Sequence, residues 1–370
     1  FTSDGSELIF PLNAKDPNED DRKIISELCQ TLGLIKESLV PQDIPLRWLV
    51  FHQEIQELSK KKNVEVLSLQ ECLQVAIRLH MVDDTKAALE FFSNLNVILY
   101  YPSILPNVVF TNPQCILDII SEIIKCVAFD RKMPFNSMLV RANKEGIISE
   151  KLLEYVKNQS PNEELIKPKD LIDLMVHLGI ASKCEKNDEY FMPVLLNNLD
   201  TQGVQDILSK WSDRIAPLAL YQEKGCLKCG SFTFLITSLL SSKQWTLAKI
   251  ENNLLCVHSN CIKMCFNELC NVTLIDNASY IEVHLDGDVD VLKEECPNIK
   301  RCLMEACEYG VQIAFICPCK LFGDKHLAIP TEASFKHKKV VCSKDGIKTL
   351  RFSELDFNAE LWLEGSKQAG

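Results

Sequence analysis

Cysteine and histidine residues in the C-terminal half of the chain have the types, and part of the spacing, of a zinc site. Cys226 and Cys229 form a C-x-x-C pair, and a later C-x-C pair follows. Structural zinc takes four ligands, commonly as two close pairs from two loops. The first candidate ligands are Cys317, Cys319, His326 and Cys342. Because the later pair is not a C-x-x-C, we favour isolated thiols, and a zinc-containing adaptor or enzyme is the alternative.

Motifs for phosphate binding and covalent catalysis are absent from the sequence. It contains no G-x-x-x-x-G-K-[ST] loop, no G-x-S-x-G elbow, no H-E-x-x-H and no kinase catalytic loop. The run 13–16 has one residue too many before its lysine to match a guanine-reading N-K-x-D motif. Cys256 and His258 could share one face of a strand, but no acid in view would orient the histidine. We therefore predict no catalytic and no cofactor-binding residue.

Other residues that could do chemistry are better explained as structural. His52, His80 and His177 are predicted to lie in helices. The acidic run 286–290 is similar to part of a calcium loop, but it lacks the spaced ligands and closing glutamate of an EF-hand. We predict a turn there.

Composition indicates a globular protein of the cytoplasm. The 370 residues are 46% hydrophobic and 25% charged, and no apolar run is long enough for a membrane span. No signal peptide is visible, and a chain that starts at Phe1 is expected to be a piece of something longer. Seventeen cysteines, an odd number, indicate free thiols in a reducing compartment.

The net charge of −11 argues against binding of nucleic acid, because phosphate contacts supply most of that affinity. Two short basic clusters, at 60–62 and 336–339, are interpreted as solvated loops. A nucleic-acid-binding protein is nevertheless one alternative, because the order of elements described next is that of a winged helix.

The first half of the chain reads as helices followed by β-hairpins. A strand at 7–13 and a helix at 21–39 come first, and Pro45 fits the first turn of a helix over 44–60. Ser68 and Glu71 form a capping box for 69–79, and Asp83 or Asp84 caps a helix ending near Leu95. The β-rich runs 97–101 and 108–111 then predict a hairpin, and Pro113 opens a long apolar helix. Three helices and a hairpin make a winged-helix unit.

The same order recurs more weakly and then gives way to a different pattern. Helices 152–156, capped by Ser149, and 168–178, ended by Gly179, precede a hairpin at 180–184 and 190–192. Beyond 195 we predict strands at 216–220, 311–316 and 339–352 and helices at 230–242 and 292–306. Strict alternation around 262–266 and 281–285 predicts half-buried antiparallel strands. The fold class is therefore α+β: a tandem winged-helix-like helical subdomain, then an α+β subdomain with a mainly antiparallel sheet.

Several segments resemble the COR domain, the "C-terminal of Roc" module of Roco proteins, of the animal death-associated-kinase or leucine-rich-repeat kind. The segments in the first half are 68–72, 88–95, 97–101 and 108–117, and those in the second are 190–196, 216–218, 230–232, 245–247, 272–276 and 280–283. Residues 8–13 resemble the last strand of the preceding GTPase domain. The chain departs from the family pattern at Asn96, where Gly is usual, and at Cys115, where Trp is common.

The resemblance implies a function without catalysis. Such a module packs against the adjacent Ras-like Roc GTPase domain, relays its nucleotide state and forms homodimers. GTP or GDP and Mg²⁺ would be bound only in that adjacent domain. The implied division is 1–42 for the end of a GTPase-like domain or a linker helix, 43–197 for the first COR subdomain and 198–370 for the second, which would dimerise.

Overall fold

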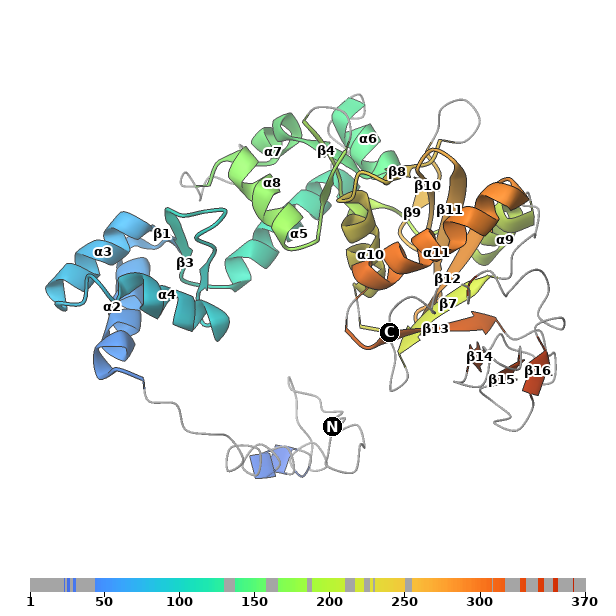
Figure 1. Cartoon of the computed structure of the whole chain (residues 1–370). Helices are drawn as coiled ribbons and strands as arrows, with labels where there is room; N and C mark the ends of the chain where they lie inside the picture. The colour runs from blue at the N-terminus through green and yellow to red at the C-terminus, as the bar shows by residue number, and fades with distance from the viewer. Residues whose placement is uncertain are drawn as a thin grey trace.

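The computed structural model shows an α+β protein with three antiparallel sheets (Figure 1). The structure describes residues 23, 25, 26, 29, 30, 44–129, 137–157, 166–184, 188–209, 217–222, 227, 228, 230–249, 255–307, 309–316, 327–330, 339–342, 349–351 and 362. The predicted strand at 7–13 lies outside these residues. Of the predicted helix at 21–39, the five described residues are helical.

The first winged-helix unit has the predicted order with one additional strand. Its elements are α2 (Leu46–Lys62), β1 (Val66–Ser68), α3 (Leu69–Arg78), α4 (Thr85–Asn94), β2 (Leu99–Tyr100) and β3 (Val108–Phe110). The strand order is β1-β3-β2, with both pairs antiparallel. Pro45 lies at the N-cap of α2, one residue before the helix. Phe51, Ile55 and Leu89 are fully buried in the core between the helices and the sheet.

The second unit repeats this order. A long helix, α5 (Gln114–Phe129), leads into α6 (Ser137–Glu145), β4 (Ile147–Ser149), α7 (Glu150–Lys157), α8 (Pro168–His177), β5 (Ser182–Lys183) and β6 (Glu189–Phe191). Its sheet has the order β4-β6-β5, the counterpart of the first unit's sheet. The tandem winged-helix prediction is therefore confirmed. The first strand of each unit was not predicted.

The remainder is dominated by one antiparallel sheet, and two of its three helices pack against one face of that sheet. After the 3-10 turn η1 (Pro193–Leu195), the helices are α9 (Thr201–Ser209), α10 (Ser231–Leu240) and α11 (Val289–Ala306). The long central strands are β7 (Leu218–Gln222), β10 (Cys261–Phe266), β11 (Cys270–Asp276), β12 (Tyr280–Asp286) and β13 (Val311–Ile316). The shorter strands are β8 (Trp245–Leu247), β9 (Val257–His258), β14 (Leu327–Pro330), β15 (Lys339–Cys342) and β16 (Thr349–Arg351). The path is β16-β15-β14-β13-β7-β12-β11-β10-β8, with β9 beside β10.

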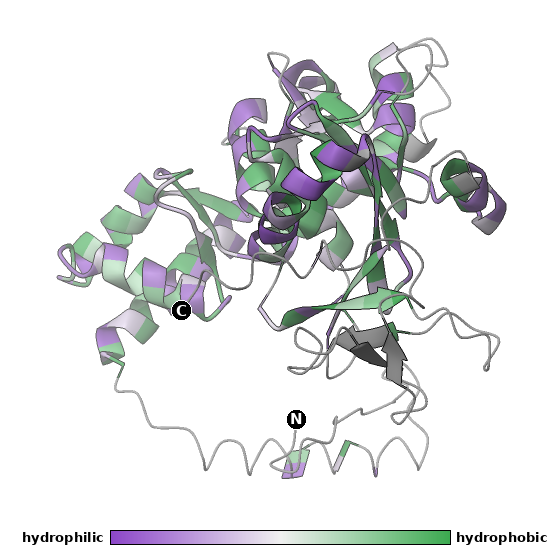
Figure 2. Cartoon of the chain, turned by 45° about the vertical axis from the view of Figure 1, so that its right-hand side comes forward, coloured by the Kyte–Doolittle hydropathy of each residue, from purple (hydrophilic) through white to green (hydrophobic). Residues whose placement is uncertain are grey.

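Helices α10 and α11 pack together over the alternating apolar residues of the sheet (Figure 1). Ile262, Met264 and Phe266 of β10 and the corresponding residues of β12 point into this core, as the alternation predicted. Trp362, from the C-terminal segment, is buried in the same core. Figure 2 shows hydrophilic and hydrophobic residues side by side on many of the helices, as expected for helices with one buried side.

Three local predictions are wrong. His80 is not helical; it lies in the turn after α3 with a positive φ of 49°. Lys60–Lys62 are the last turn of α2 and not a loop. Strand β12 is more than half-buried, because Tyr280 and Glu282 on its second face are also buried, while His284 and Asp286 on that face are partly exposed.

Candidate interaction surfaces

The third helix of a winged-helix unit is the element that usually enters a DNA groove. In the first unit this helix is α4, whose charged residues are Lys86 and Glu90; in the second it is α8, with Lys169 balanced by Asp170 and Asp173. Neither helix carries the excess of basic side chains needed to neutralise phosphates. Neither α4 nor α8 therefore presents the net positive charge that is usual for a helix in a DNA groove.

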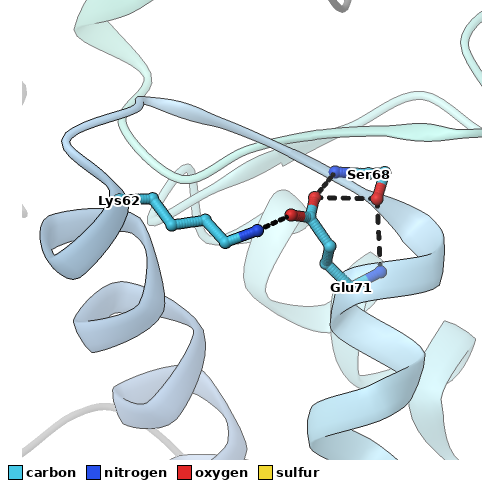
Figure 3. A network of polar contacts seen from close by, with 3 residues as sticks. All are labelled: Lys62, Ser68 and Glu71. Carbon is cyan, nitrogen blue, oxygen red and sulfur yellow. Dashed lines mark hydrogen bonds and ion pairs between the residues drawn. The ribbon is translucent and has the colours of Figure 1, made fainter.

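The cap of α3 uses Lys62, one lysine of the predicted basic cluster 60–62. Glu71 accepts hydrogen bonds from the Ser68 backbone N–H and hydroxyl, both at 2.7 Å, and also from Lys62 (Figure 3). The Glu71 N–H in turn donates to the Ser68 hydroxyl at 3.2 Å, which completes the predicted capping box. Burial alone would raise the pKa of Glu71, but the bonds from Lys62 and Ser68 outweigh it and lower the pKa. Lys62 thus joins α2 to α3.

The start of α4 is held differently. Asp84 occupies the N-cap position, as predicted, but its side chain makes no capping hydrogen bond. Its carboxylate instead lies 3.2 Å from the Arg47 guanidinium of α2. Next to this pair, Trp48 contacts the ring of Phe91, and His52 stacks on Phe92 at 4.8 Å between ring centroids. Burial lowers the pKa of His52, which favours the neutral form of this histidine.

The two winged-helix units contact each other through a wing and a helix end. The ring of Tyr101, in the wing of the first unit, meets His177 at the end of α8 edge to face, with 5.4 Å between centroids. Around this pair, Val66, Val108 and Phe110 of the first unit share one core with α5 and the second unit. The units are thus packed together and not merely tethered.

Gly179 is one of the residues at which the second unit contacts the large-sheet part of the protein. Gly179 has a φ of +68°, and a Cβ at that position would lie 2.8 Å from the Phe234 ring of α10. The Thr237 hydroxyl, one turn along α10, donates to the Gly179 carbonyl at 2.8 Å. Ile147 and Phe191 of the second unit are buried in the core of the large sheet. Helix α10 therefore packs against both parts of the protein.

The face of the large sheet opposite α10 and α11 holds a polar cluster that sequence reasoning missed. The Glu282 carboxylate accepts a hydrogen bond from the Tyr280 hydroxyl at 3.4 Å and lies 2.9 Å from His284 Nε2. On the neighbouring strands the Tyr221 hydroxyl donates to Gln312 at 3.1 Å. Burial, together with the charge of Glu282, raises the pKa of Tyr280. Because Glu282 is almost wholly buried, a dissolved substrate cannot reach its carboxylate in this conformation, and the cluster is best explained as structural.

The predicted cysteine and acidic sites are placed as follows. Cys317, Cys319 and His326 lie outside the described residues, and of Cys342 only its backbone position in β15 is described, opposite Ala328. Within the described ranges, no three His, Cys, Asp or Glu side chains converge on a possible metal position. The acidic run 286–290, predicted as a turn, spans the end of β12 and the start of α11: Asp286 ends the strand, and the Asp288 carboxylate caps the helix by accepting from the Asp290 N–H at 2.9 Å.

The described cysteines are thiols rather than disulfides, as predicted. Burial raises the pKa of Cys72, Cys261, Cys270 and Cys296 to about 12, which makes these thiols poor nucleophiles. Cys256 is buried beside the half-buried His258, whose pKa burial lowers. Among the described residues, no carboxylate is hydrogen-bonded to His258, so the geometry shows no third member of a catalytic arrangement.

Comparison with known proteins adds no relative: no family model matches the sequence, and no curated protein matches it either. Among the helices that the structure describes, none combines the length and the apolar character needed to cross a bilayer.

Proposed function

We propose that this chain is a non-catalytic regulatory and dimerisation module that packs against a Ras-like GTPase domain of the Roc type and relays its nucleotide state. The proposal starts from the resemblance to the COR domain. The observation that carries it furthest is the unbroken packing from the first winged-helix unit through the second to the large sheet. A module that relays a conformational change needs such contiguous contacts between its ends.

Two contacts make this packing specific. The Tyr101–His177 ring contact joins the two winged-helix units, and the Gly179–Thr237 hydrogen bond joins the second unit to α10. A displacement of the first unit would therefore be transmitted to the sheet subdomain. This subdomain is the proposed site of dimerisation. The weak charge of α4 and α8 supports protein contact over a role in reading DNA.

The experiment has a binding arm and a mass arm. The purified chain is titrated with Ras-like GTPase domains of the same organism, loaded with GDP or with a non-hydrolysable GTP analogue, while light scattering measures its mass. We expect binding to a GTPase domain with an affinity that depends on the nucleotide, together with a dimeric mass. Labelled duplex DNA at low salt and a fluorescent guanine nucleotide should not bind the chain alone. A monomer that binds no GTPase domain, or a chain that turns over a nucleotide, would refute the proposal.

A further inference from the structure

Helix α2 exposes aliphatic side chains on the side away from its core. Leu46, Leu49 and Val50 are 75%, 45% and 39% exposed, and their i, i+3, i+4 spacing places them together on one side of the helix. Phe51 and Ile55 bury the opposite side. Single exposed aliphatic residues are ordinary, but three on the first turns of one helix form an apolar stripe suited to a partner.

Two ion pairs border this stripe. The Arg47 guanidinium lies 3.2 Å from the Asp84 carboxylate, and the Glu54 carboxylate lies 3.5 Å from the Arg78 guanidinium. These four side chains are between 40% and 64% exposed. An apolar centre with a polar, partly exposed rim is the usual composition of a protein–protein interface.

The charges of α2 itself are arranged so that the surface is complementary to a second copy of itself. Arg47 and Glu54 lie seven residues apart, about two helical turns, with Val50 between them. If two α2 helices pack antiparallel with Val50 near a two-fold axis, Arg47 of each chain faces Glu54 of the other. Opposite charges then meet at both ends of the stripe, whereas a parallel arrangement would bring like charges together. A two-fold contact between identical chains needs this kind of self-complementary surface.

We propose that the Leu46–Leu49–Val50 stripe is a contact between two copies of this chain, packed as antiparallel α2 helices about a two-fold axis. The stripe is small, so the association is expected to be reversible and to depend on protein concentration. The inference goes beyond the proposed function, which places dimerisation in the sheet subdomain.

Charge reversal tests the pairing of the two ends. In the full chain, Arg47→Glu and Glu54→Arg should each weaken self-association roughly tenfold, because each brings like charges together between the two copies. An equal mixture of the two variants should associate more strongly than either variant alone, since the reversed end of one chain then meets the reversed end of the other. Sedimentation velocity over a range of protein concentrations measures all three samples.

A cross-link near the proposed axis provides the second measurement. In the full chain carrying Val50→Cys, mild oxidation should join position 50 of one chain to position 50 of another, as read by peptide mass spectrometry. The matched control is Leu117→Cys, at an aliphatic position of helix α5 that is 56% exposed. At equal protein concentration we expect the first link to form roughly tenfold faster than a link between two positions 117.

The inference is overturned by equal linking rates at the two positions, by a link from position 50 to Cys29 of the same chain, or by single variants that associate as the unaltered chain does. A mixture that associates no better than the single variants also overturns it, because the pairing of opposite ends is then wrong.

The double variant Leu46→Glu, Val50→Glu separates this contact from the dimer of the proposed function. If the double variant stays dimeric and no link forms at position 50, the sheet subdomain holds the dimer and the inference fails. If the double variant is monomeric while position 50 links in the Val50→Cys chain, the α2 contact stands and dimerisation through the sheet fails. Leu117→Glu should leave the mass unchanged.

Discussion

The two winged-helix units end their third helices with the same turn but use it differently. After α4, the N–H groups of Leu95, Asn96 and Val97 bond to carbonyls four, three and five residues back. After α8, Leu178, Gly179 and Ile180 repeat all three bonds. Asn96 and Gly179, the middle residues, both have positive φ, at 54° and 68°. Backbone geometry alone therefore demands a residue that tolerates the left-handed region, and Asn is the commonest alternative to Gly there.

The difference lies in what surrounds the turn. Asn96 is exposed, and so are Leu95 and Val97 on either side of it. Gly179 lies under the Phe234 ring of α10, which leaves no room for a Cβ. The first turn needs its residue for conformation only, whereas the second needs it for conformation and for close approach. The turn after α8 therefore also connects the second winged-helix unit to α10 of the large-sheet subdomain.

The largest expected effect is that of Gly179→Ala. The substitution adds strain at a positive φ and forces Phe234 to move, and together these should lower the free energy of unfolding by about 3 kcal/mol. The matched change Asn96→Ala carries only the conformational cost, about 1 kcal/mol. Urea unfolding monitored by circular dichroism measures both. Equal costs at the two positions would show that the contact with α10 contributes nothing.

The helix caps allow a second comparison. Ser68 and Ser149 each end the first strand of a unit and precede its second helix, but Ser68 has Glu71 three residues on, whereas Ser149 has Leu152. Ser68→Ala should cost about 1.5 kcal/mol, because the reciprocal bonds of the capping box are lost. Ser149→Ala should cost less, about 0.5 kcal/mol, since no glutamate completes its box. Chemical denaturation of the two variants checks the order, and a larger loss at Ser149 would contradict it.

Acid should act on the first unit through Glu71. Its pKa is lowered in the folded state, so its contribution to stability is fully present above the ordinary glutamate pKa of 4.5 and is lost as pH falls through the lower folded value. Glu71→Gln should remove that part of the pH dependence, and the two proteins should converge in stability only below the folded pKa of Glu71. Because Glu71 is partly exposed, we expect a contribution below about 1 kcal/mol. Thermal melting between pH 3 and 7 makes the comparison, and parallel curves for the two proteins would argue against it.

The smallest effect is a gain. Asn96→Gly installs in the first unit the residue that the second unit has, and it should stabilise the protein by roughly 0.5 kcal/mol because Gly adopts a positive φ without steric cost. Differential scanning calorimetry should show a slightly higher midpoint. A lower midpoint would mean that the Asn96 side chain makes a contribution beyond its backbone conformation.

The order of helices and hairpins was readable from the sequence because each signal is local. Ser68 with Glu71 marks a helix start, Gly179 marks a helix end, and alternation along 281–285 marks a strand. The three-residue strands β1 and β4 were missed because three residues are too few to show a period. His80 was misplaced because the apolar pattern of α3 continues past its end into Met81.

The interaction surfaces were less predictable, because they depend on contacts distant in sequence. The polar residues of β12 alternate with apolar ones, which usually indicates a face in water, yet Glu282 on that face is only 1% exposed. Phe234 and Gly179 are likewise far apart in the sequence, so no local pattern predicts their contact. The predicted zinc ligands and the domain boundaries stay predictions.

The burial of Ile147, Phe191 and Leu196 among the side chains of the large sheet has a practical consequence for dissecting the molecule. Residues 43–197 expressed alone would turn these three side chains toward water, and such a fragment should bind hydrophobic dyes and self-associate even if both winged helices form. The second unit and the sheet therefore have to be expressed as one piece, because each contributes side chains to the hydrophobic core of the other.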